Sequence, residues 1–368
     1  MDKVRFAVVG IKGMGIGHVR TAAKTEEVEL VAVCDIDEDA VKKCAEEYNV
    51  EHFVDYKELH RSGKVDAIAT ATPHFLHAPV AIDALNQGIH VLVEKPLSCT
   101  VEDGDAMIAA AKKNNVKLAV GHSARPGARG LRGAIESGMI GDIMRVLWCS
   151  NDLRTMGYYN SGAWRGTWAM EGGGVLINQT IHDMDTLQYL VGPVKEVVAM
   201  VANIAHDIEV EDIAGASLRF ENGAFGVFHV SLTNIPGLSR REIVGDRGTI
   251  IMGDGGNRFA RLSASVKEYI AGVGEEPKVT WEDTLPSAEP SGPPWGGSMV
   301  RDLAMAILED RSPFVSGESA LKAIEMMNAI VLSHFKKRPV TIPLDRKEYT
   351  VLIKDLSEGK YGNLRVKG

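Results

Sequence analysis

The chain has 368 residues, which is enough for two domains of ordinary size. Hydrophobic residues make up 45% of it and charged residues 24%, a balance typical of globular proteins that a disordered chain does not reach. No sequence period runs through the chain, so a fibrous protein is excluded as well. The formal charge of −8 argues against nucleic acid or an anionic membrane as a partner, because both attract clustered lysine and arginine.

The sequence shows no membrane or export signal. No stretch approaches the roughly 20 consecutive apolar residues of a membrane helix. The first residues, Met1–Arg5, run directly into a strand-like segment without a signal-peptide core. The four cysteines lack CxxC spacing and are too few for a disulfide scaffold. We therefore expect a cytoplasmic protein with reduced cysteines.

The first 120 or so residues alternate short apolar runs with amphipathic segments of helix length. The runs predicted to be strands are Val4–Val9, Val28–Cys34, Ala67–Thr70, His90–Val93 and Lys117–Val120. The predicted helices lie at about 15–24, 37–48, 74–87 and 100–114. The last of them starts with Thr100 and Asp103 in the spacing of a capping box. Because continuous apolar strands are buried on both faces, the alternation predicts an α/β domain with a doubly wound parallel sheet over residues 1–122.

After residue 122 the pattern changes to successive strands joined by short turns. The predicted elements are a helix at 131–137, a strand at 143–150, a helix at about 175–191, strands at 194–205, 212–220, 224–233, 240–245 and 248–252, and two closing helices at about 298–310 and 317–336. Gly192-Pro193 stops the long helix, and Glu221–Gly223 is a hairpin turn signal. We therefore expect a separate α+β domain over residues 123–368 with a mostly antiparallel open sheet.

A glycine-rich turn follows the first strand and opens a helix, with the sequence Val9-Gly-Ile-Lys-Gly-Met-Gly-Ile-Gly-His18. Gly10 and Gly15 occupy the first and third places of the pattern G-x-G-x-x-G, whose glycines let the backbone approach a pyrophosphate at a helix N-terminus. Lys12 stands in the second place, so the match is imperfect and Gly13 must provide part of the close approach. The predicted dinucleotide contacts in this turn are Gly10, Lys12, Gly13, Met14 and Gly15.

Asp35 ends the second predicted strand, 20 residues after Gly15. A carboxylate in this place accepts hydrogen bonds from the ribose hydroxyls of NAD and repels the 2′-phosphate of NADP. No arginine or lysine follows until Lys42. The first domain is therefore predicted to be a Rossmann domain that binds NAD in preference to NADP.

Three further motifs complete a recognisable set. Ala71–His77 follows the strand at 67–70, Val93–Pro96 follows the strand at 90–93, and Glu171–Asp185 places three glycines at the start of the long helix. Together with the glycine turn, these motifs make the chain resemble, over essentially its whole length, the family of glucose–fructose oxidoreductase, inositol dehydrogenase and rhizopine catabolism proteins (Gfo/Idh/MocA). The resemblance implies hydride transfer with NAD. The cofactor contacts that it adds are Thr72, His77, Glu94 and Lys95.

Lys95 and His182 are the predicted catalytic residues. Lys95 lies at the carboxyl end of a parallel strand, where ligands bind in open α/β sheets, and its amine can stabilise a developing oxyanion. Histidine has the side-chain pKa nearest neutrality, so His182 suits a base that takes the alcohol proton during hydride removal. The resemblance further implies a Lys95–Pro96 bond that is often cis.

Asn178, His182 and Asp185 have the spacing i, i+4, i+7 and are predicted to share one helix face. Relatives in this family commonly carry aspartate where this chain has Asn178. Because an asparagine cannot take up a proton, Asn178 is expected only to orient the substrate or the histidine. Proton transfer is therefore assigned to His182, with Lys95 assisting.

Residues 154–168, before the three glycines, are rich in aromatic and hydrogen-bonding side chains. Aromatic faces can stack on a sugar ring while polar side-chain ends pair with its hydroxyls, and the resemblance includes carbohydrate-acting members with similar segments. A packed loop without a ligand is the alternative. The predicted substrate contacts are His122, Tyr158, Tyr159, Trp164, Arg165, Asn178 and His182.

Two patterns in the sequence could suggest a metal site. The acidic residues with the spacing of a calcium loop are Asp35, Asp37, Asp39 and Glu46. Ala40 stands where that loop needs glycine, and a strand precedes it in place of a helix. The histidines that could suggest zinc are His74, His77 and His182. No cysteine accompanies them, and the family that the chain resembles transfers hydride without metal, so we expect no metal.

These patterns predict an NAD-dependent oxidoreductase acting on a secondary alcohol of a sugar, glycoside or cyclitol. Two alternatives stay open: a redox-neutral glycoside-processing enzyme with tightly bound NAD, and a non-catalytic NAD-binding regulatory protein. The presence of both Lys95 and His182 counts against the regulatory protein. Strands such as 194–201 and 224–231 carry apolar residues on both faces, which predicts a homo-oligomer (a dimer or tetramer) built on the second domain's sheet.

Overall fold

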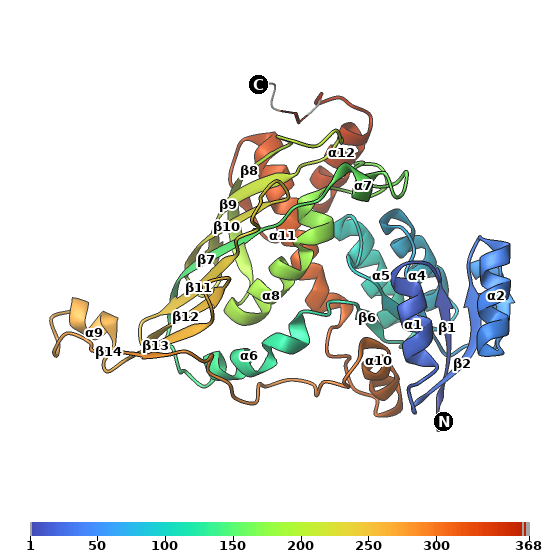
Figure 1. Cartoon of the computed structure of the whole chain (residues 1–368), viewed down its shortest axis with the longest axis horizontal. Coiled ribbons are helices and arrows are strands. Elements are labelled where there is room, and N and C mark those ends of the chain that lie inside the picture. Colours follow the sequence, from blue (N-terminus) through green and yellow to red (C-terminus); the bar gives the residue numbers. More distant parts are fainter. Residues whose placement is uncertain (1, 363, 366–368) are drawn as a thin grey trace. The chain divides into compact units, whose positions relative to one another are not determined.

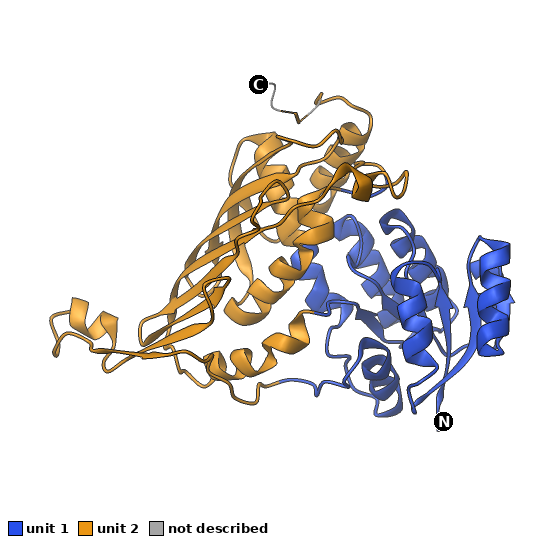
Figure 2. Cartoon of the chain, in the orientation of Figure 1, with its two compact units in different colours: residues 1–123, 170–172, 292–324 blue, residues 124–169, 173–291, 325–368 orange. Residues whose placement is uncertain are grey.

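The computed structural model describes residues 2–362 and 364–365, which form two compact units (Figure 2). Unit 1 holds the described residues up to Ser123 together with Met170–Gly172 and Gly292–Ile324. Unit 2 holds Ala124–Ala169, Gly173–Ser291 and the described residues from Glu325 onward. Within the described ranges, no helix is both long and apolar enough to cross a membrane.

Unit 1 is built on a six-stranded, fully parallel sheet in the order β3-β2-β1-β4-β5-β6. Its strands are β1 (Val4–Val9), β2 (Val28–Cys34), β3 (Glu51–Phe53), β4 (Ala67–Thr70), β5 (His90–Val93) and β6 (Leu118–Val120). Its helical elements are α1 (Met14–Ala22), α2 (Glu38–Tyr48), α3 (Tyr56–Arg61), η1 (His74–Leu76), α4 (His77–Asn86), α5 (Val101–Lys113) and α10 (Met299–Leu308). This confirms the predicted doubly wound sheet, whose strand order reverses between β1 and β4.

Helix α10 comes late in the chain but packs with unit 1. Its residues Val300, Leu303 and Ala304 are buried in one cluster with Val4 and Phe6 of β1. The predicted second domain, residues 123–368, therefore contains a segment, 292–324, that completes the core of the first unit. Burial of the apolar face of α10 stabilises this arrangement, so a segment from late in the chain packs with the first unit.

Unit 2 contains a nine-stranded sheet in the order β14-β13-β12-β11-β7-β10-β9-β8-β15 (Figure 1). Its strands are β7 (Ile143–Asn151), β8 (Val194–Ala202), β9 (Ile213–Phe220), β10 (Phe225–Ser231), β11 (Arg240–Gly245), β12 (Gly248–Gly253), β13 (Arg258–Leu262), β14 (Val279–Glu282) and β15 (Val340–Thr341). Only β7 and β10 pair in parallel among the described strands of this sheet, which confirms the mostly antiparallel prediction.

The helical elements of unit 2 depart from the prediction in several places. They are η2 (Arg125–Ala128), α6 (Arg129–Glu136), α7 (Met156–Tyr159), η3 (Val175–Gln179), α8 (Ile181–Val191), α9 (Val266–Ile270), α12 (Arg346–Ser357) and the second half of α11 (Gly317–Lys336). The predicted single helix at 175–191 is wrong, because η3 is a π-helix that ends before α8 begins. The amide and hydroxyl of Thr180 both donate to the Val175 carbonyl, which closes the wider turn. The prediction did not include η2, α7, α9 and α12, the last of which is capped by Asp345.

One face of the unit 2 sheet carries helices, as Figure 1 shows for α6, α8 and α11. Trp148 of β7, Phe228 of β10 and Ile243 of β11 are buried on this side. Val198, Met200, Phe225 and Val227 are about half or more exposed on the strands β8 and β10. The opposite face of the sheet is therefore open in the single chain.

Candidate active site

The glycine turn of unit 1 is built from backbone contacts that only glycine permits. A Cβ on Gly10, whose φ is +83°, would lie 2.8 Å from the Ala71 carbonyl oxygen. A Cβ on Gly15 would lie 1.7 Å from the carbonyl oxygen of Gly10. Gly13, with φ +53°, precedes the first residue of α1. The turn therefore brings bare backbone to the N-terminus of α1, the arrangement that a pyrophosphate requires.

Asp35 is tied to this turn. Its Oδ2 accepts a hydrogen bond from the Ile11 amide at 3.0 Å, and its Oδ1 accepts one from the Asp37 amide at 3.0 Å. Lys12 is exposed and pairs with Asp37 at 2.6 Å. Asp35 therefore stabilises the turn, in addition to the ribose contact predicted for it. Lys12 would have to leave its ion pair with Asp37 to make the predicted phosphate contact.

The loop after β4 is joined to the loop after β5 through His77. Its Nδ1 lies 2.6 Å from the carbonyl oxygen of Pro96, and its Nε2 lies 2.9 Å from the carbonyl oxygen of Thr72. Burial lowers the pKa of His77, although both carbonyls favour its protonation. Thr72 and His77 were predicted as cofactor contacts, and the structure shows them connecting two loops at the carboxyl edge of the sheet.

Glu94 and Lys95 follow β5 directly, and the Lys95–Pro96 bond is cis, as the resemblance implied. Glu94 Oε1 lies 2.7 Å from Nε2 of His18 on α1, and its Oε2 accepts the Lys95 amide at 3.1 Å. Burial acts to raise the pKa of Glu94, but the bond to His18 and the charges of His18 and Lys95 outweigh it and lower that pKa. A Cβ on Gly121 would press on the Glu94 carboxylate at 3.1 Å. No local sequence pattern predicts this contact between His18 and Glu94.

In unit 2, a buried carboxylate binds the backbone at the point where the three glycines lead into η3. Glu211 Oε1 accepts the amides of Gly174 at 2.8 Å and Leu176 at 3.1 Å, and the Glu211 carbonyl accepts the Val175 amide. A Cβ on Gly174 would lie 1.9 Å from that carbonyl oxygen. Glu211 therefore fixes the start of the element that carries Asn178, a role that no local sequence pattern indicated.

The predicted shared face of Asn178, His182 and Asp185 rested on one continuous α-helix, and that premise is wrong. Asn178 lies in η3, whereas half-buried His182 lies in the first turn of α8. Asp185 is 2% exposed and pairs with buried Arg125 through Nε at 2.9 Å. Asp185 thus anchors α8 within unit 2.

Side chains from residues 154–168 and from η3 meet at Tyr158. The Tyr158 hydroxyl oxygen accepts hydrogen bonds from Arg165 Nη1 at 2.6 Å, Asn178 Nδ2 at 2.7 Å and Gln179 Nε2 at 3.1 Å. The Arg165 guanidinium also lies 4.3 Å from the Tyr158 ring centroid and 4.4 Å from that of Trp164. Four predicted substrate residues, Tyr158, Trp164, Arg165 and Asn178, therefore form one cluster.

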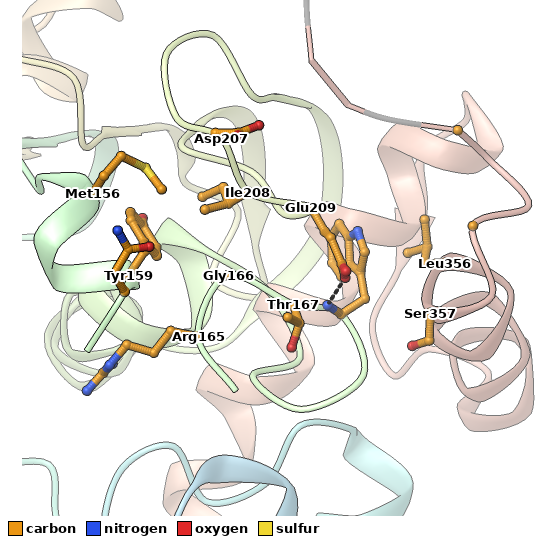
Figure 3. Close-up of a pocket in the computed structure, with 14 residues that line it drawn as sticks. Met156, Tyr159, Arg165, Gly166, Thr167, Asp207, Ile208, Glu209, Leu356 and Ser357 are labelled. Atoms are coloured by element: carbon orange, nitrogen blue, oxygen red, sulfur yellow. Dashed lines mark hydrogen bonds between the residues drawn. The ribbon is translucent and has the colours of Figure 1, made fainter. Parts of the chain in front are cut away.

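Tyr159 points to a pocket of about 500 Å³ within unit 2 (Figure 3). Among the residues that line it are Tyr159, Arg165, Trp168, Glu209 and Leu356. The Trp168 amide donates to Glu209 at 3.2 Å, the bond drawn in Figure 3. The remaining predicted substrate residue, His122, is fully buried in unit 1 just after β6.

Metal ligands do not cluster in the part of the chain that the structure describes. No group of three or more histidine, cysteine, aspartate or glutamate side chains there could hold a metal ion. In the segment with calcium-loop spacing, Asp37 caps α2 and Glu46 lies within that helix.

Family models cover most of the chain. Residues 4–122 match a model described as the GFO/IDH/MocA oxidoreductase family with an NAD-binding Rossmann fold. Residues 128–251 match the model of the GFO/IDH/MocA C-terminal domain. The chain belongs to the GFO/IDH/MocA family. It is thus an NAD-binding oxidoreductase, as the motifs predicted.

Individual members of the GFO/IDH/MocA family are similar over most of their length. A myo-inositol 2-dehydrogenase of Thermotoga maritima is 28% identical over 76% of this chain and 92% of its own. A scyllo-inositol 2-dehydrogenase (NAD(+)) of Bacillus subtilis is 28% identical over 68% of this chain and 74% of its own. The solved WlbA dehydrogenase of Bordetella pertussis, in complex with NADH and UDP-GlcNAcA, is 29% identical with a TM-score of 0.78 and covers 93% of this chain and 100% of its own.

Proposed function

We propose that this chain is an NAD-dependent dehydrogenase that oxidises a secondary alcohol of a sugar, glycoside or cyclitol. The observation that carries the proposal is the presence of Lys95 at the end of β5 and His182 at the start of α8 in one GFO/IDH/MocA chain. Two relatives are named as inositol dehydrogenases, and a structural neighbour binds a nucleotide sugar. These names support the substrate class.

The residues of unit 1 fit NAD, because Gly10 and Gly15 leave a cradle that a Cβ would fill and Asp35 stands beside it. Bound NAD would supply the acceptor for the hydride of the alcohol carbon. We assign the alcohol proton to a ring nitrogen of His182 and the hydrogen bond that steadies the alcohol oxygen to Nζ of Lys95. Asn178, held by Tyr158, would orient the substrate or His182.

The proposed roles follow the predicted domains. Residues 1–122 would bind NAD and contribute Lys95 and His122 to the substrate site, and residues 123–368 would provide the other substrate contacts and form the oligomer. The proposed substrate contacts remain His122, Tyr158, Tyr159, Trp164, Arg165, Asn178 and His182. A cytoplasmic location stays a prediction.

The substrate class is tested by a screen of sugars, glycosides and inositols with added NAD, followed at the nicotinamide absorbance. We expect NADH to form with at least one compound that carries a ring hydroxyl. A purified protein that already shows bound nicotinamide, and that turns over glycosides without added NAD, would contradict the dehydrogenase and indicate the redox-neutral alternative.

Cofactor choice gives the first prediction. The wild-type enzyme should use NAD more efficiently than NADP, because the Asp35 carboxylate repels a 2′-phosphate. Asp35→Ala should shift the ratio of the two kcat/KM values toward NADP by at least about tenfold, which corresponds to about 1.4 kcal/mol. Asp37→Ala is the matched control, since it removes the neighbouring carboxylate that pairs with Lys12 but keeps Asp35. Equal wild-type efficiency with both cofactors would rule out this role of Asp35.

Oligomerisation gives the second prediction. Val198 and Met200 on β8 and Phe225 and Val227 on β10 are 48–75% exposed on the open face of the unit 2 sheet. Their register places Val227 opposite Ser217 of β9, which in turn lies opposite Val198. We propose that a second copy of the chain covers this face, since exposed apolar surface of this kind marks interfaces.

Sedimentation at micromolar concentration should show a dimer or tetramer, and the double variant Met200→Asp, Val227→Asp should shift it to smaller species. Val351→Asp is the control, because Val351 is 58% exposed but lies on helix α12 and not on a strand of the sheet. A wild-type monomer, or equal dissociation by the control variant, would contradict the proposed interface.

A further inference from the structure

A buried hydrogen bond in unit 1 joins the helix of the glycine turn to the loop that carries Lys95. His18 and Glu94 are each 9% exposed, and Nε2 of His18 lies 2.7 Å from Oε1 of Glu94. Because a carboxylate can only accept, Nε2 carries the hydrogen of this bond. His18 belongs to α1, which follows β1, whereas Glu94 follows β5. Since β4 lies between β1 and β5 in the sheet, the contact reaches across one whole strand.

The place of His18 follows from the glycine turn. His18 comes three residues after Gly15, on the buried face of α1 that also carries Val19 and Ala22. Because Gly15 packs against the Gly10 carbonyl without room for a Cβ, the start of α1 is fixed relative to the turn. The imidazole about one turn further along the helix is therefore held in a defined position.

The Glu94 carboxylate has a different donor on each of its oxygens. Oε1 accepts from His18, and Oε2 accepts the backbone amide of Lys95 at 3.1 Å. Gly121, which follows β6, leaves the space for this carboxylate, since a Cβ there would lie 3.1 Å from both oxygens. Burial acts to raise the pKa of Glu94, but its two donors and the neighbouring charges lower it. Both oxygens are therefore available as acceptors.

We propose that His18 is a positioning residue for Lys95. The imidazole fixes the Glu94 carboxylate in the orientation that accepts the Lys95 amide, and so determines the place from which the Lys95 side chain starts. Its role in the reaction rests on the proposed function of Lys95, which is to steady the alcohol oxygen. The helix that begins at the proposed pyrophosphate cradle thus also orients a residue proposed to contact the substrate.

A matched pair of variants separates this hydrogen bond from ordinary packing. His18→Leu keeps a bulky side chain that favours a helix but removes the donor. His18→Gln places an amide N–H at a reach similar to that of Nε2, so it should restore what leucine loses. Arg20→Ala is the control within α1, because Arg20 is exposed.

Hydrogen exchange at single amides, measured by NMR without substrate or NAD, reports the position of the Glu94 carboxylate. The Lys95 amide should exchange at least about tenfold faster in His18→Leu than in the wild type, the effect of losing about one hydrogen bond. It should exchange at near the wild-type rate in His18→Gln and Arg20→Ala. The amide of Glu94 itself donates to the Thr70 carbonyl at 2.9 Å, so it should be unchanged in all three variants and serves as an internal reference.

Unchanged exchange at Lys95 in His18→Leu would overturn the proposal. Equal acceleration in His18→Leu and His18→Gln, or acceleration of the Glu94 amide as well, would indicate a loss of packing and would overturn it too. If His18→Leu does not fold, His18→Ala removes the same donor from the same helix and is interpreted in the same way.

Turnover tests the role of this contact in the reaction. His18→Leu should lower kcat about tenfold or more with KM little changed, because Lys95 is proposed to act on charge that develops in the transition state. His18→Gln should restore most of the rate. Faster exchange with an unchanged kcat would overturn the role toward Lys95. Since the exchange measurement needs no turnover, failure to find a sugar substrate would count against the proposed function alone.

Discussion

Replacing His182 with alanine should lower kcat by about 10²–10⁴-fold, the usual contribution of a general acid–base group. The half-buried imidazole lies in the first turn of α8, which is anchored by the buried Arg125–Asp185 pair. The helix should therefore stay in place when the ring is removed. NAD affinity, measured by equilibrium binding, should barely change, because the residues assigned to NAD lie in unit 1.

Thr186→Ala is a suitable control, since Thr186 is half-buried on the same helix one turn further along. A rise in KM with kcat intact in His182→Ala would mean that the histidine only binds the substrate. Proton transfer would then belong to Lys95 or to a tyrosine of the pair Tyr158 and Tyr159.

Gly15→Ala should reduce NAD affinity by at least about 100-fold, equivalent to about 2.8 kcal/mol. Its Cβ would fall 1.7 Å from the Gly10 carbonyl oxygen, so the turn or the start of α1 must move. Overpacking of this kind costs about 1–3 kcal/mol or more, and here the displaced backbone is the proposed pyrophosphate cradle.

Gly17→Ala is the matched control within the same helix. Apart from its chain neighbours and the backbone of its own helix, no described atom lies within 4 Å of the position of its Cβ. Alanine also favours a helix over glycine by about 0.5–1 kcal/mol. NAD affinity should be unchanged and the thermal midpoint equal or slightly higher. Equal loss of affinity in both variants would show that helix α1, and not the close approach of Gly15 to Gly10, determines binding.

The buried parallel strands could be predicted well, because each one is a continuous apolar run. The bounds of β1, β2, β4 and β5 agree with the predicted ranges to the residue. Strand β3 (Glu51–Phe53) was missed, since three residues with a charge and a histidine give no apolar run at the edge of a sheet.

Individual site residues could be predicted, but their mutual contacts could not. Glu211 is 37 residues from Gly174 in the chain, and His18 is 76 residues from Glu94. Such pairs depend on tertiary packing that no local pattern reports. The π-helix Val175–Gln179 could not be predicted either, because its sequence carries no local signal that separates it from an α-helix.

The return of α10 to unit 1 limits how this fold could be recombined. A cofactor-binding part taken from another family member at residue 122 would arrive without the helix that buries Val4 and Phe6. A fusion that exchanges the cofactor-binding unit between relatives would therefore have to transfer at least two separate stretches of chain. Because the first unit of this chain is assembled from separate stretches of sequence, single substitutions such as those at Asp35 offer a more accessible route to altered cofactor use.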